Sequence, residues 1–134
     1  GWANLGEIEL PEHIFLLKEY VPFEWLFARM KLLVHHGGSG TVALGLRSGI
    51  PQIIIPFFAD QPEWGKKLAT LGVAPAPIPI LELTTENLTS SISQALNNTN
   101  LQQQAEAIAQ SLKLENGIEE TVQIIQQYLS SSVR

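Results

Sequence analysis

The stretch Leu32-Leu33-Val34-His35-His36-Gly37-Gly38-Ser39-Gly40-Thr41 decides the fold of this chain. Its apolar first part is typical of a buried strand, and its glycines permit a tight turn into a helix. The first turn of a helix carries N–H groups without intrahelical partners and the positive end of the helix dipole, so it attracts phosphate. The stretch therefore predicts a site for a phosphorylated ligand, and we expect a nucleotide. Glycine and serine can also occupy such a turn for its geometry alone, and this alternative stays open.

The two adjacent histidines have different expected roles. Successive side chains of a strand point to opposite faces, so at most one of His35 and His36 can face the ligand. We expect the other to be packed or hydrogen-bonded inside the protein.

Short apolar segments alternate with helical patterns along the first 80 residues. The sequence predicts strands over 14–17, 32–35 and 52–55, and helices over 23–30, 39–47 and 60–71. Residues 73–78, rich in proline, are expected to form an edge strand or an extended segment. This order predicts an α/β fold with a Rossmann-like parallel sheet flanked by helices. Ligands of such folds bind at the carboxyl ends of the strands, where His36 and Asp60 fall.

The last third of the chain is predicted to be helical. Thr84 can cap one helix, a second runs through Leu101 to Leu112, and a third follows Gly117 from Ile118 to Leu129. We assign these helices to packing, while a Gln-rich face could instead serve oligomerisation. The expected organisation is one domain over 1–134, with a core of strands and helices that carries the site over 1–80 and helices over 81–134.

Composition limits the classes of function. The chain has 134 residues with 45% hydrophobic and 16% charged side chains, which describes a globular domain. A net charge of −5 and the scatter of its 8 lysines and arginines argue against a nucleic-acid partner. The absence of cysteine favours a cytoplasmic protein, and no apolar run is long enough to span a membrane. Acidic residues and histidines lack the spacing of a metal site.

The motifs around the glycine turn resemble a known family. His36-Gly37-Gly38-Ser39-Gly40-Thr41 is followed by Arg47-Ser48-Gly49-Ile50-Pro51 and by Pro56-Phe57-Phe58-Ala59-Asp60-Gln61. Pro51 lies 15 positions after His36 and Asp60 lies 24 after it (51 − 36 and 60 − 36). The set resembles the carboxyl-terminal, donor-binding domain of nucleotide-sugar glycosyltransferases of the GT-B fold. It is most similar to the branch that glycosylates sterols, lipids and macrocycles, and the spacing selects His36 as the phosphate-facing histidine.

The resemblance implies roles for individual residues. His36 would contact the donor diphosphate together with Gly37, Gly38, Ser39, Gly40 and Thr41, and Asp60 and Gln61 would hold hydroxyls of the transferred sugar. Asp60 can also cap a helix with Glu63 completing a capping box, and the two roles are compatible. Tyr20-Val21-Pro22 would lie against the nucleobase, although Tyr20 and Trp25 can equally pack on the sheet.

The implied reaction is transfer of a hexose to a hydroxyl of a lipid, sterol or similar acceptor. The hexose expected first is glucose, with UDP-glucose as its donor. The resemblance implies no metal cofactor, and it places the catalytic base and the acceptor in an amino-terminal domain. Leu44 stands where other branches have a ribose-binding Glu, which leaves the base of the nucleotide open. The alternative is a non-catalytic nucleotide-sugar-binding or assembly module.

The beginning of the chain adds further expectations. Gly1 stands in place of Met, and by resemblance a first strand and helix would precede these residues. We therefore expect an amino-terminally truncated domain that is inactive alone and forms a homodimer through an unpaired strand edge. Contact with a membrane surface remains compatible with an acceptor that is a lipid.

Overall fold

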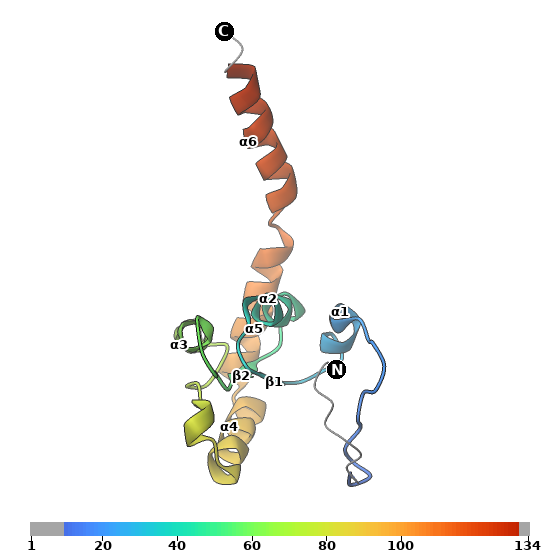
Figure 1. Ribbon diagram of the computed structural model, residues 1–134, viewed down its shortest axis with the longest axis vertical. Coiled ribbons are helices and arrows are strands. Elements are labelled where there is room, and N and C mark those ends of the chain that lie inside the picture. The colour runs from blue at the N-terminus through green and yellow to red at the C-terminus, as the bar shows by residue number, and fades with distance from the viewer. Residues whose placement is uncertain (1–9, 132–134) are drawn as a thin grey trace.

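The computed structural model describes residues 10–131, so the expectations about residues 1–9 and 132–134 lie outside the described part. Two strands pair in parallel, β1 (Leu33–His35) and β2 (Gln52–Ile54), with Leu33 opposite Gln52. The helices and turn, in chain order, are α1 (Phe23–Phe27), α2 (Ser39–Ser48), α3 (Gln61–Thr70), η1 (Ile80–Glu82), α4 (Thr85–Asn97), α5 (Thr99–Lys113) and α6 (Gly117–Ser131) (Figure 1).

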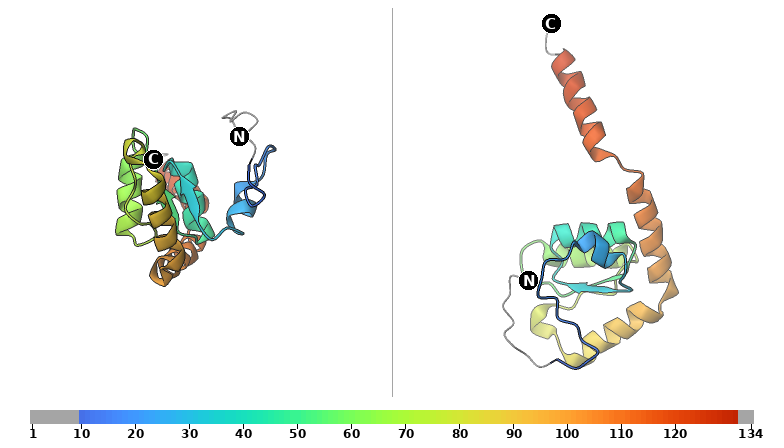
Figure 2. Two further views of the ribbon diagram at one scale, coloured as in Figure 1. Left: turned by 90° about the horizontal axis from the view of Figure 1, so that it is seen from below. Right: turned by 90° about the vertical axis from the view of Figure 1, so that its right-hand side faces the viewer.

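Strand β2 is the centre of the core, and helices cover both of its faces. Ile53 joins one cluster with Ala95 and Leu101, at the ends of α4 and α5. Ile54, on the opposite face, joins Val42, Leu68 and Ala105 from α2, α3 and α5. Figure 2 shows α2 and α4 on opposite sides of the two strands. The predicted α/β fold with a parallel sheet is confirmed, and β2 is buried on both faces as expected for a strand of this kind.

The second edge of β2 is covered by an extended segment, residues 73–79, which is one of the two expected forms. The Gln52 N–H donates to the Val73 carbonyl at 3.0 Å, and the Ile78 N–H donates to the Ile54 carbonyl at 2.9 Å. The prolines at 75, 77 and 79 have no N–H to donate, which explains why the segment adds single hydrogen bonds instead of a ladder.

Two elements of the amino-terminal part differ from the prediction. Residues 14–17 form no strand, and Phe15 is 85% exposed. Apolar residues form a strand only where a neighbour takes their backbone hydrogen bonds, and within residues 10–131 β1 pairs only with β2. Helix α1 ends at Phe27 instead of residue 30, because the N–H groups of Arg29 and Met30 bond to carbonyls only three residues back.

The three helices predicted for the last third are confirmed. Thr84 accepts the Asn87 N–H at 3.2 Å while the Asn87 side chain accepts the Thr84 N–H at 3.0 Å, so α4 begins with a capping box. Helices α4 and α5 bury apolar residues in the core.

Packing was the wrong expectation for α6. This helix projects away from the body of the protein and buries none of its side chains (Figure 1). Periodic apolar residues predict a helix and a face, but they do not supply the surface that would cover the face. Within residues 10–131, no helix combines the length and the apolarity needed to cross a bilayer.

Candidate functional site

The turn from β1 to α2 leaves the beginning of α2 uncapped. Gly38 occupies the N-cap position, and among residues 10–131 no side-chain cap accepts a hydrogen bond from the first turn of the helix. Val42 is the first residue whose N–H bonds within the helix, to the Gly38 carbonyl at 3.0 Å. Since Ser39 and Gly40 are exposed, the N–H groups of this first turn are accessible to an anion from solvent.

The glycines of the turn are present for different reasons. Gly37 has φ +91°, and a Cβ there would lie 2.7 Å from Ile54 Cγ2. A Cβ on Gly38 would lie 2.6 Å from His36 Nε2, so the imidazole of His36 lies close to the N-cap. Gly40 has nothing within 4 Å of an added Cβ. Geometry therefore accounts for Gly37 and Gly38, whereas nothing in the surrounding structure requires Gly40.

The two histidines differ as the alternation of a strand predicts. His36 is exposed, whereas His35 is partly buried and hydrogen-bonded on both ring nitrogens. The Gly37 N–H donates to His35 Nδ1 at 3.1 Å, and His35 Nε2 lies 2.9 Å from Gln52 Oε1. Burial lowers the pKa of His35, the hydrogen bond to Gln52 offsets part of this effect, and the neighbouring His36 lowers the pKa further.

Asp60 and Gln61 begin α3 and both bond to protein groups. Gln61 is 7% exposed, and its Oε1 accepts the N–H groups of Phe57 and Phe58 at 2.9 and 3.3 Å. Asp60 Oδ2 accepts the Trp64 Nε1–H at 2.9 Å. Gln61 Oε1 therefore holds the loop before α3, and Asp60 stays exposed beside an indole ring.

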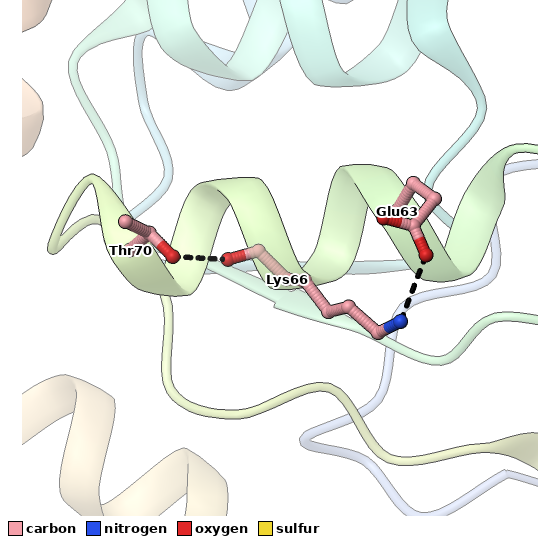
Figure 3. A network of polar contacts seen from close by, with 3 residues as sticks. All are labelled: Glu63, Lys66 and Thr70. Atoms are coloured by element: carbon pink, nitrogen blue, oxygen red, sulfur yellow. Dashed lines mark hydrogen bonds and ion pairs between the residues drawn. The ribbon is translucent and has the colours of Figure 1, made fainter.

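The expected capping box at α3 is wrong. Asp60 has helical backbone angles, φ −82° and ψ −8°, and its side chain bonds to no N–H of the first turn. A side-chain cap normally needs an extended backbone at this position. Glu63 instead pairs with Lys66 at 2.8 Å on the outer face of α3, where the Thr70 hydroxyl donates to the Lys66 carbonyl (Figure 3). That ion pair is exposed and contributes little.

The glycine turn and the start of α3 lie side by side. A Cβ on Gly37 would be 3.3 Å from the Gln61 carbonyl oxygen, so the two predicted motifs meet at the carboxyl ends of β1 and β2. Tyr20 is 90% exposed and makes no hydrogen bond or ring contact with that turn, nor does it pack on the sheet. Pro22 lies at the N-cap of α1, after the partly buried Val21.

Two residues near the site were missed by the sequence analysis. Gln52 is fully buried in β2, and Trp64 holds Asp60. A polar side chain inside an otherwise β-branched strand was the available signal for Gln52. Among residues 10–131, no group of three or more His, Cys, Asp or Glu side chains could hold a metal ion.

Comparison with known proteins identifies the family of this chain. Residues 4–127 match the family described as Erythromycin biosynthesis protein CIII-like, C-terminal domain. The chain belongs to this family. It is 39% identical over 132 residues to a sterol 3-beta-glucosyltransferase of Arabidopsis thaliana, covering 98% of this chain and 21% of the relative. A second sterol 3-beta-glucosyltransferase of the same plant is 42% identical over 131 residues, covering 96% of this chain and 21% of the relative.

Solved glycosyltransferases share the fold. The spinosyn rhamnosyltransferase SpnG, complexed with thymidine diphosphate, superposes with a TM-score of 0.80 at 25% identity. The match covers 90% of this chain and 32% of that one. The chain therefore has the fold of the carboxyl-terminal domain of GT-B glycosyltransferases, and it spans about a fifth of the length of the curated relatives.

Proposed function

We propose that this chain forms the donor-binding part of an inverting glycosyltransferase that transfers a hexose to a hydrophobic alcohol. The hexose we propose is glucose, with UDP-glucose as its donor. The observation that carries the proposal is the uncapped beginning of α2, with exposed His36 beside it. The family match and the sterol-glucosylating relatives support the reaction class.

The diphosphate is the part of the sugar donor for which the turn offers the most hydrogen-bonding groups. The N–H groups of Ser39, Gly40 and Thr41 would donate to phosphate oxygens, and the hydroxyls of Ser39 and Thr41 can add to them. The His36 imidazole, placed next to Gly38, would donate to the oxygen on which charge grows as the nucleoside diphosphate leaves. We propose no metal cofactor for this step, because the helix terminus and these donors stabilise the same charge.

The sugar and the nucleobase would lie to either side of the diphosphate. Asp60 keeps a carboxylate oxygen for sugar hydroxyls, and Gln61, whose Oε1 is already engaged, would offer its Nε2 as a donor. Tyr20, Val21 and Pro22 would approach the base, where the exposed ring of Tyr20 can stack. We further propose a cytoplasmic location with peripheral membrane contact, which suits an acceptor drawn from a lipid.

Binding of UDP tests the proposal. We expect a dissociation constant of roughly 0.1–1 mM, because the contacts of this part of the site must offset the cost of association. His36→Ala should weaken binding by about 1–2 kcal/mol, roughly 5- to 30-fold, as for a hydrogen bond to a charged group. His13→Ala, which removes an exposed histidine outside the turn, is the matched control.

NMR titration of the full chain measures all three affinities. Equal affinity of the unaltered chain and the His36→Ala variant would contradict the role of His36. Absence of UDP binding at millimolar concentration would contradict the proposed function itself.

A further inference from the structure

We propose that His35 is a positioning residue for donor binding: as the neutral tautomer with its proton on Nε2, it accepts the Gly37 N–H and fixes the turn from which α2 begins. The proposal rests on the proposed function for its ligand. His35 does not contact the donor, but it determines the shape of the site.

The hydrogen bonds around His35 fix its tautomer. Nδ1 accepts the Gly37 N–H at 3.1 Å, so it carries a lone pair and the proton of the neutral ring is on Nε2. Nε2 then donates to Gln52 Oε1 at 2.9 Å. The Gln52 amide nitrogen donates to the Val42 carbonyl at 3.5 Å, which agrees with the same orientation of the amide. Each hydrogen bond in the series from Gly37 through His35 and Gln52 to Val42 thus has a defined donor and acceptor.

Gln52 is held in place by α2. Its side chain is fully buried, and a Cβ on Gly45 would lie 2.5 Å from Gln52 Cδ, so the amide is packed directly on the backbone of the helix. A buried amide without partners is costly, and here both ends of the amide are bonded. His35 is therefore anchored through β2 to the same helix whose first turn it positions.

Gly37 is the residue through which these hydrogen bonds can affect the ligand site. Its backbone is in the left-handed region at φ +91°, and its N–H is used by His35. Protonation of His35 would put a hydrogen on Nδ1, facing the Gly37 N–H, and two donors cannot bond to each other. The charged form of His35 therefore releases the turn, and the neutral form holds it.

The surroundings of His35 favour the neutral form. Burial lowers the pKa of His35. The neighbouring His36 lowers it further, and the centroids of the two rings are 6.3 Å apart. Strand β2 carries no ionisable side chain, and the one charged residue of α2 is Arg47 in its last turn. The charged residues at and along α3 are Asp60, Glu63, Lys66 and Lys67.

Two amide substitutions separate positioning from plain structural support. In His35→Asn, Oδ1 takes the place of Nδ1 and can accept the Gly37 N–H, but the side chain does not reach Gln52. In His35→Gln, the terminal amide nitrogen can donate to Gln52, but nothing accepts the Gly37 N–H. Both variants lose one of two hydrogen bonds, so a merely structural role predicts similar losses from each.

The experiment measures UDP affinity of the unaltered chain and both variants between pH 5 and pH 8 by NMR titration. We expect His35→Asn to bind UDP within about threefold of the unaltered chain near pH 8, and His35→Gln to bind roughly tenfold more weakly. Because UDP itself changes protonation in this range, the effect of His35 is read from the ratio of the affinity of the Asn variant to that of the unaltered chain. That ratio should rise as the pH falls, since only the unaltered chain loses its acceptor for the Gly37 N–H when His35 is protonated.

Outcomes for the inference and for the proposed function are distinct. UDP binding by the unaltered chain with equal affinities of the two variants would overturn the role of His35 alone. No UDP binding by the unaltered chain would overturn the proposed function. The amide resonance of Gly37, followed without ligand, should shift with the same midpoint as the His35 ring. A Gly37 amide that does not respond to His35 titration would overturn the positioning role independently of any ligand.

Discussion

Gly45 and Gly40 lie on the same helix, yet an added methyl group would meet different surroundings at the two positions. At Gly45 it would lie 2.5 Å from Gln52 Cδ, whereas at Gly40 it would meet nothing within 4 Å. Gly45→Ala should therefore lower the free energy of unfolding by about 1–3 kcal/mol, the usual cost of overpacking. Gly40→Ala should leave it unchanged or raise it by up to about 1 kcal/mol, since alanine favours a helix over glycine.

Urea unfolding followed by circular dichroism gives both values under the same conditions. Equal effects at the two positions would mean that Gln52 can move away from Gly45, and the anchored arrangement of His35 would then be incorrect.

Single residues also show where sequence reasoning succeeds and where it stops. Alternation along a strand separates His35 from His36, and the structure confirms that one is hydrogen-bonded inside and the other is exposed. The bonds of Gln61 Oε1 to the loop before α3 could not be predicted, because they depend on the path of that loop. Asp60 illustrates the same limit, since a cap depends on backbone angles that the residue types do not determine.

At the scale of elements, helices were predicted better than strands. Helical patterns follow from local spacing, and Thr84 marks its own helix start through a capping box. Strands depend on a partner from elsewhere in the chain. Residues 52–55 lie between β1 and the extended segment, and β2 forms there. Residues 14–17 have no strand partner within the described residues 10–131 and form no strand.

The outer edge of β1 leads to a prediction about association. Within residues 10–131, β1 has a strand neighbour on one side only, and Val34 is 41% exposed. Because an unpaired strand edge favours pairing with another chain, we expect a dimer at high protein concentration. Val34→Lys should lower the association, since a charged side chain at an edge opposes pairing, and Val34→Thr is the matched control.

Light scattering over a concentration series measures this association. A chain that stays monomeric throughout the series, with cooperative thermal unfolding, would contradict pairing through the β1 edge.

At the scale of the whole molecule, motif spacing carried more information than composition. Composition argues against some classes of function, such as a basic nucleic-acid surface, but it identifies none. The intervals from His36 to Pro51 and to Asp60 indicate the family, and the match over residues 4–127 confirms it. The spacing of the apolar residues of α6 predicts its helix, but it does not determine which surface would cover them.

The most direct test of the central claim is a backbone amide map of UDP binding to the uniformly ¹⁵N-labelled chain, with uridine as the control ligand. If the first turn of α2 binds the diphosphate, UDP will shift the amide resonances of Ser39, Gly40 and Thr41 in a saturable manner. Uridine, which lacks phosphate, will leave these three amides in place. Shifts of equal size with UDP and uridine, or UDP shifts that spare this turn, would contradict the account.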